Sequence, residues 1–163
     1  MQKYGLNSLI IIVLFIATSH TYTYTEAIEN RFSDIKTYYY VAENGFVENS
    51  SDKFAQHHLE RWGLNVVVGS ISKIFNLDIW TVYKGAVIFC MLVVVFLINC
   101  LNWDNPRKII ALVLLIYNPY TFRLYYSVPG MINDYVFYTT IVALIVGVLK
   151  RSNWIIIFAV TFS

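Results

Sequence analysis

Residues 85–103 read GAVIFCMLVVVFLINCLNW and contain no charged side chain. A helix needs about 20 consecutive, mostly apolar residues to cross the hydrocarbon core of a bilayer. This segment has almost that length, and polar linkers flank it on both sides. It therefore predicts a transmembrane helix over about residues 82–103, and the rest of the chain is interpreted outward from it.

The composition supports lipid as the main solvent of this chain. Apolar residues make up 58% of the sequence and charged residues only 13%, whereas a soluble domain is about one quarter charged. Inside a bilayer the backbone must satisfy its own hydrogen bonds, which favours helices. We therefore expect an all-α, polytopic transmembrane helix bundle. The net charge of +2, with no cluster of Lys and Arg, argues against a nucleic-acid partner.

Further apolar segments predict additional spans at about residues 4–18, 109–126 and 132–149, and a partial span at 154–163. Lys3 and the short apolar centre of the first segment would also suit a signal peptide. However, Ala17-Thr18-Ser19-His20 is a poor cleavage site, which favours an uncleaved first span.

Two features qualify the later spans. Pro119 should kink or end the helix of the third span. The sequence stops at Ser163, within an apolar segment. We therefore expect an N-terminal fragment of a longer protein, or the product of a truncated gene.

A polar stretch, residues 19–62, separates the first two predicted spans. It holds seven acids and four bases, and its turn signals divide two short expected helices, at about 29–42 and 52–62. The segment that follows, residues 62–75, is short for a span and is interrupted by polar and small residues. We expect it to be an interfacial helix lying on the bilayer.

The basic residues set the expected orientation. If residues 62–75 lie on the surface, Lys3, Arg107-Lys108 and Lys150-Arg151 all fall on one side of the membrane, which the positive-inside rule makes cytoplasmic. The polar loop 19–62 and the loop from Tyr120 to Asp134 then share the outer side. We expect a multi-pass integral protein of the plasma (inner) membrane.

Cysteines and aromatic residues give less specific signals. Cys90 and Cys100 would lie about 15 Å apart along one helix, too far for a disulfide, so we interpret them as packing residues. Tyr and Trp residues gather near the ends of the apolar segments, which is typical of an aromatic belt at the interface. The alternative is that some of these rings line a site for a carbohydrate or a lipid headgroup. The residues concerned are Trp80, Tyr83, Trp103, Tyr117, Tyr120, Tyr125, Tyr126 and Trp154.

Asp34 is the first candidate catalytic residue. It lies about 16 residues after the first predicted span, and on a helix it shares a face with Tyr38. A carboxylate beside the membrane could act as a general base on an acceptor hydroxyl or could bind a cation. The alternative is a solvated acid paired with Arg31 or Lys36.

His57 and Arg61 lie on one face of the second expected short helix. An arginine fork suits a phosphate, and a neighbouring histidine could add a donor or a proton. The alternative is a set of ordinary surface side chains. The His57-His58 pair lacks the spacing of a zinc motif, so no metal ligand is assigned. A divalent cation remains an open alternative as a cofactor.

Arg123 and Asp134 bracket the second outer loop. A charge at the membrane interface is costly without a partner. The two side chains could pair and anchor the turn, or they could hold a substrate, and the sequence leaves both alternatives open.

The order of these features resembles the N-terminal third of a GT-C type membrane glycosyltransferase, a group that includes protein O-mannosyltransferases and enzymes using polyprenyl-phosphate sugars. The similarity is carried by His57-His58-Leu59-Glu60-Arg61-Trp62-Gly63-Leu64 with the following segment to Asp78, and by Tyr117-Asn118-Pro119 with Arg123 and Asp134. Asp34 falls at the position of the family's catalytic acid and Asp134 near its second acid. Asp34 is followed by Ile35, where many relatives have another acid.

The resemblance implies transfer of a sugar from a polyprenyl-phosphate donor to an acceptor on the non-cytoplasmic face. In that mechanism Asp34 would activate the acceptor, and Arg61, Arg123 or His57 would neutralise the donor phosphate. Membrane lipids and a lipid-linked sugar are the implied partners, and the acceptor is not specified. Two other functions remain open: a polysaccharide polymerase or transporter, in which Arg123 and Asp134 mark a translocation path, and a non-catalytic membrane fragment.

Overall fold

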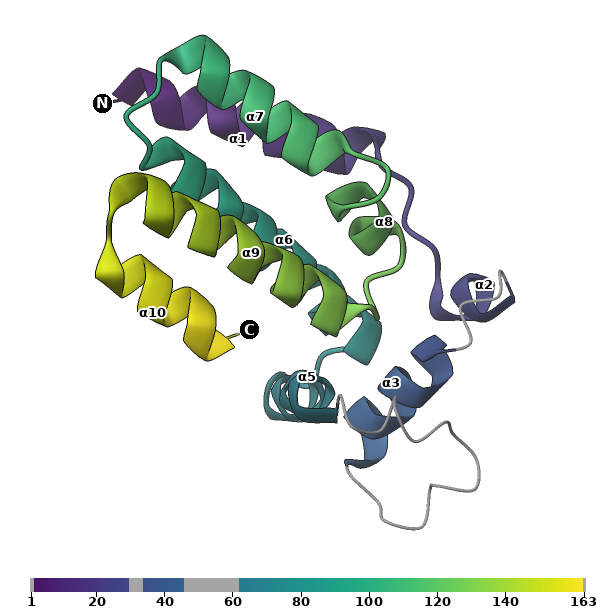
Figure 1. Cartoon of the computed structure of the whole chain (residues 1–163). Helices are drawn as coiled ribbons and strands as arrows, with labels where there is room; N and C mark the ends of the chain where they lie inside the picture. The colour runs from purple at the N-terminus through teal and green to yellow at the C-terminus, as the bar shows by residue number, and fades with distance from the viewer. Residues whose placement is uncertain (1, 30–33, 46–61, 163) are drawn as a thin grey trace.

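The computed structural model describes residues 2–29, 34–45 and 62–162, and throughout these ranges the regular structure is helical, with no strand (Figure 1). The expectation of an all-α fold is therefore confirmed. The element order is α1, α2, α3, α5, α6, α7, α8, α9 and α10. Helices α1, α6, α7 and α9 lie alongside one another, and α2, α3 and α5 gather at one end of this group.

The central helix is α6, Ile79–Asn99. It begins three residues before the predicted position of 82, because Asp78 caps its N-terminus by accepting a 3.0 Å hydrogen bond from the Thr81 amide. It ends four residues before the predicted position of 103, at a turn closed by the Cys100 amide. Four of its side chains are fully buried: Tyr83, Val87, Met91 and Val94.

Helix α9, Ile132–Lys150, packs against α6 and closely matches the span predicted at 132–149. It ends where Arg151 adopts a left-handed conformation (φ 52°). Helix α10, Asn153–Phe162, then folds back along α9. Gly147 allows this close approach, since an added Cβ would lie only 2.9 Å from Ile156 Cγ1.

Helices α1, Gln2–Thr18, and α7, Asn105–Tyr117, form a second pair. The Phe15 and Tyr117 rings meet edge to face with centroids 5.4 Å apart. The predicted effect of Pro119 is confirmed, because α7 ends at Tyr117 and the chain resumes as the short helix α8, Phe122–Ser127. The segment predicted as one span, 109–126, is thus divided, and α7 is only about 20 Å long at 1.5 Å per residue.

The polar stretch contributes α2, Tyr24–Glu29, and α3, Asp34–Asn44. The start predicted for the helix at about 29–42 is therefore wrong, because Glu29 is the last residue of α2 and the longer helix begins at Asp34. The other short helix, expected at 52–62, lies outside the described residues.

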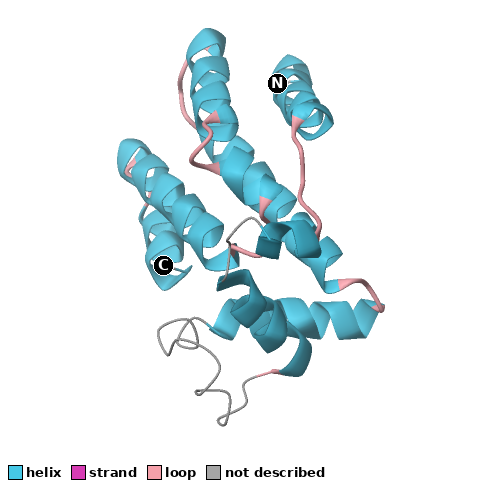
Figure 2. Ribbon diagram, turned by 90° about the vertical axis from the view of Figure 1, so that its right-hand side faces the viewer, coloured by secondary structure: helices cyan, strands magenta, loops and turns pink. Residues whose placement is uncertain are grey.

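Helix α5, Trp62–Phe75, has the bounds expected for the interfacial segment. It runs roughly crosswise to α6 and α9, as Figures 1 and 2 both show. It packs against α3 at Gly69, where an added Cβ would overlap the carbonyl of Ala42. It stops at Asn76, whose φ of 51° is left-handed.

Both α6 and α9 are long and apolar enough to cross a membrane. Of the residues in the most apolar part of each helix, only 50% in α6 and 44% in α9 are buried. Most of the exposed residues on these two helices carry large apolar side chains. The exposed ones are Phe89, Leu92 and Phe96 on α6, and Phe137, Ile141, Leu144, Ile145, Val148 and Leu149 on α9. Cys90 and Cys100 are both free, as expected.

Candidate functional site at the tyrosine end of the bundle

Hydrogen bonds join the two predicted outer loops at one end of the bundle. The Trp80 indole donates to the Tyr22 carbonyl at 2.8 Å, and the Tyr22 amide donates to the Ser127 carbonyl at 3.0 Å. The Ser127 hydroxyl lies 2.9 Å from the carbonyl oxygens of both His20 and Arg123, which share its one hydrogen as acceptors. Segments more than a hundred residues apart in sequence therefore meet here. We call this the tyrosine end, and its rings are Tyr22, Tyr24, Tyr39, Trp80, Tyr83, Tyr125 and Tyr135.

A half-buried aromatic pair lies at this end. The rings of Tyr24 and Tyr39 stack with centroids 4.2 Å apart, and Trp80 meets Tyr24 edge to face at 5.9 Å. Burial raises the pKa of Tyr39, and the nearby charges of Asp78 and Glu43 raise it further. The pair thus presents aromatic surface beside two exposed carboxylates, Asp78 and Glu43.

Beneath this pair lies a buried polar network. The Tyr83 hydroxyl lies 2.7 Å from Asn65 Oδ1 and 3.2 Å from the Tyr38 carbonyl oxygen, and it is the donor to these acceptors. The Tyr135 hydroxyl lies 3.4 Å from the Tyr83 carbonyl oxygen. These contacts join α3, α5, α6 and α9. The network therefore fixes the relative positions of these four helices at the tyrosine end.

Asp34 is exposed as the first residue of α3. Its neighbour Ile35 is buried against Gly130, where an added Cβ would lie 3.3 Å from Ile35 Cγ2. Gly130 belongs to the turn that leads into α9. The candidate acid Asp34 is therefore adjacent in sequence to Ile35, the residue of α3 that contacts the second outer loop at Gly130.

Arg123 is exposed on α8, and Asp134 is half-buried in the first turn of α9. Burial raises the pKa of Tyr125, and the charge of Asp134 raises it further, so this carboxylate lies near that ring. The bonds of Ser127 hold the turn, and the two alternatives for Arg123 and Asp134, an anchoring pair or a substrate site, stay predictions.

The other predicted site residues, His57 and Arg61, lie outside the described residues. Within the described ranges, no group of three or more His, Cys, Asp or Glu side chains is close enough together to hold a metal ion.

Sequence reasoning missed Asn65 and Asp78 as structural members of this end. In the sequence, Asn65 was only one of several polar or small residues that interrupt an apolar segment, together with Gly69 and Ser72. Their spacing at i, i+4 and i+7 places them on one face of a helix, and that pattern could have indicated a buried polar face. No known family model, curated protein or solved structure matches this chain.

Proposed function

We propose that this chain is a multi-pass membrane protein whose tyrosine end transfers a sugar from a polyprenyl-phosphate donor on the non-cytoplasmic face. The membrane part of the proposal rests on the apolar side chains that cover the outer faces of α6 and α9. A soluble monomer rarely exposes such continuous apolar surface. In a bilayer the same faces would contact lipid, and α1 and α7 would complete the bundle.

Helix α5 supports the same assignment through an inverted pattern of burial. Asn65, Gly69 and Ser72 lie on its buried face, with Asn65 at 0% and Ser72 at 8% exposure, while Ile74 is 74% exposed and Phe75 66%. Val67 and Ile71 extend this exposed apolar face. A helix that lies crosswise to the spans and carries its apolar face outward has the form of an interfacial helix.

The observation that carries the catalytic part is the contact between the two loops. Ile35 packs on Gly130, so an exposed carboxylate on α3 lies next to the loop that carries Arg123 and Asp134. In the proposed reaction, Asp34 accepts the proton of the acceptor hydroxyl as its oxygen forms the new bond to the sugar carbon. The bond from that carbon to the donor phosphate oxygen breaks, and Arg123 stabilises the departing polyprenyl phosphate.

The test is a transfer assay in membranes that carry the protein, with radiolabelled polyprenyl-phosphate mannose or glucose as the donor. Asp34→Asn should abolish transfer and leave the protein level unchanged, and Asp134→Asn should lower transfer. Glu29→Gln, which removes another exposed acid from the same end, is the matched control and should retain transfer. Full activity of Asp34→Asn would remove this residue from the mechanism.

A further inference from the structure

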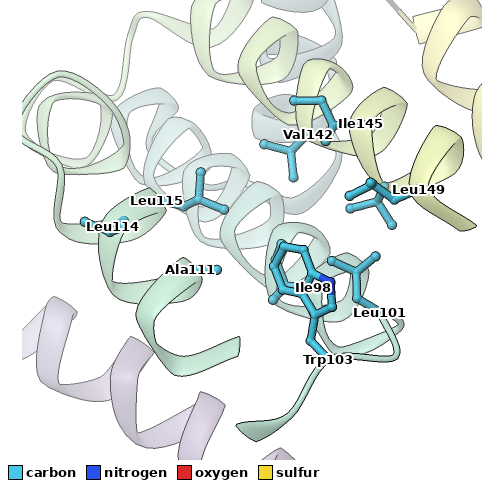
Figure 3. A pocket seen from close by; sticks show the side chains of 10 residues that line it. Ile98, Leu101, Trp103, Ala111, Leu114, Leu115, Val142, Ile145 and Leu149 are labelled. Carbon is cyan, nitrogen blue, oxygen red and sulfur yellow. The ribbon is translucent and has the colours of Figure 1, made fainter. Parts of the chain in front are cut away.

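An apolar groove lies between α6, α7 and α9, at the end of the bundle opposite the tyrosine end (Figure 3). Its volume is about 280 Å³. The lining side chains are Ile98, Leu101, Trp103, Ala111, Leu114, Leu115, Val142, Ile145, Val146 and Leu149. Leu114, Ile145 and Leu149 are each more than half exposed, so the groove opens onto the outer surface of the bundle, where lipid would lie.

The groove continues toward a cation. A second hollow, of about 420 Å³, shares Trp103, Ala111 and Leu114 with it and adds Ile110 and Arg107. The Arg107 side chain is 75% exposed, and its Nε donates to the Asp104 carboxylate at 3.1 Å. A guanidinium has five N–H donors in a fork that matches phosphate oxygens, so most of its donors remain available.

The surrounding charges favour an anion at this mouth. Lys150 and Arg151 directly follow the groove residue Leu149, and Lys108 donates to the Asn99 carbonyl at 3.0 Å. Within the described residues, Asp104 is the one acid at this end of the bundle. Among the described residues, this end of the bundle therefore carries four cations, Arg107, Lys108, Lys150 and Arg151, and one carboxylate.

We propose that this groove binds one acyl chain of an anionic phospholipid, whose phosphate is held by Arg107. The apolar lining takes the chain, and the basic mouth lies at the level where a headgroup would be. Trp103, at 38% exposure, lies between the two parts, in the interfacial position that tryptophan favours. The excess of cations over acids at the mouth favours an anionic phospholipid over an apolar protein segment, which would leave that excess positive charge unmatched.

The proposal is independent of sugar transfer, because the groove and the tyrosine end lie at opposite ends of the bundle. The experiment uses the whole chain, purified in a neutral detergent, with phosphatidylglycerol or phosphatidylcholine as the added probe. Native mass spectrometry counts the lipid molecules retained. We expect one molecule of phosphatidylglycerol to be held in preference to phosphatidylcholine.

Two variants address the two parts of the groove. Arg107→Gln should weaken retention of phosphatidylglycerol roughly fivefold, the effect of one cation near a lipid phosphate, and weaken retention of phosphatidylcholine less, because the choline ammonium already offsets the charge of its phosphate. Ala111→Phe should fill the groove and lower retention of both lipids. The matched controls are Lys36→Gln, an exposed cation at the tyrosine end, and Leu92→Phe, an exposed apolar residue of α6 outside the groove. Both should bind as the unaltered protein does.

Equal retention of the two lipids by the unaltered protein would overturn the proposal. So would an equal loss of phosphatidylglycerol in Arg107→Gln and Lys36→Gln. A lipid-free dimer would also overturn it, since a second copy of the chain would then be the occupant. If Ala111→Phe does not fold, Arg107→Gln decides the outcome, because its exposed side chain supports no buried packing.

Discussion

The hydroxyl of Tyr83 on α6 donates a 2.7 Å hydrogen bond to the side-chain oxygen of Asn65 on α5, and both residues are fully buried. This bond links the crosswise helix to the central helix. A buried donor and acceptor are costly to leave unpaired. The pair therefore fixes where α5 lies along α6 and, with it, the base of the tyrosine end.

Removing this hydroxyl should destabilise the protein. Tyr83→Phe leaves the Asn65 oxygen buried without its donor, so we expect the free energy of unfolding to fall by about 1–2 kcal/mol. Denaturant unfolding of the purified protein in detergent micelles measures the change. Tyr120→Phe is the control, because Tyr120 is 82% exposed, and it should be neutral. Equal stability of the two variants would contradict a structural role for the bond.

Gly69 should not tolerate a side chain. A methyl group there would overlap the Ala42 carbonyl, so Gly69→Ala should separate α3 from α5 and lower the thermal stability measured in micelles. Gly85→Ala is the matched control, because no described residue lies within 4 Å of an added Cβ there. In a helix interior that substitution should be neutral or stabilising by up to about 1 kcal/mol. A Gly69→Ala variant that is more stable to heat than the Gly85→Ala variant would contradict the packing of α3 on α5.

Much of the helical layout follows from the apolar pattern alone. Pro119 predicted the break after α7, and the uncharged residues around Met91 predicted the central helix. The start of α6 was harder to predict, because Asp78 caps the helix through a hydrogen bond that its carboxylate accepts from the Thr81 amide. The site was least predictable, because the stack of Tyr24 on Tyr39 and the contact of Ile35 with Gly130 join segments that are distant in sequence.

The exposed face of α5 should lie in lipid. A nitroxide label attached at Ile74→Cys, in a variant whose native cysteines are replaced by serine, should collide more often with oxygen than with a water-soluble nickel complex. Oxygen concentrates in the bilayer and the nickel complex in water, so the ratio of the two collision rates reports depth. A label at Glu43→Cys, on the exposed side of α3, should show the opposite preference. Similar ratios at both positions would contradict the interfacial assignment of α5.

Glu26 should show a pH-dependent role in holding α2. The Thr23 amide and hydroxyl donate to its carboxylate at 2.8 Å and 2.9 Å, in a capping box, and the backbone bond is the main reason that the pKa of Glu26 is lowered. Because the folded pKa is depressed, this contribution is fully present above the unfolded value of about 4.3. It is lost as the pH falls through the lower folded value. The protection of the Thr23 amide, measured by NMR as its exchange rate relative to the intrinsic rate at each pH, should fall in that range.

The Glu26→Gln variant provides the control for this titration. A glutamine oxygen can still accept from Thr23 but does not titrate, so the protection of the Thr23 amide relative to its intrinsic exchange rate should no longer change across the acidic range. An unchanged pH response in this variant would assign the effect to another group.

The orientation of the bundle gives the last prediction. The α6–α7 linker holds Arg107 and Lys108, and the Lys108 ammonium is bonded to the end of α6, whereas Gly130 lies at the tyrosine end. If the basic residues set the topology, reporter fusions after Lys108 and after Arg151 should be cytoplasmic, and fusions after Ser50 and after Gly130 should be external. A cytoplasmic signal at Ser50 would contradict the topology. It would also put Asp34 on the wrong side of the membrane for the proposed sugar transfer.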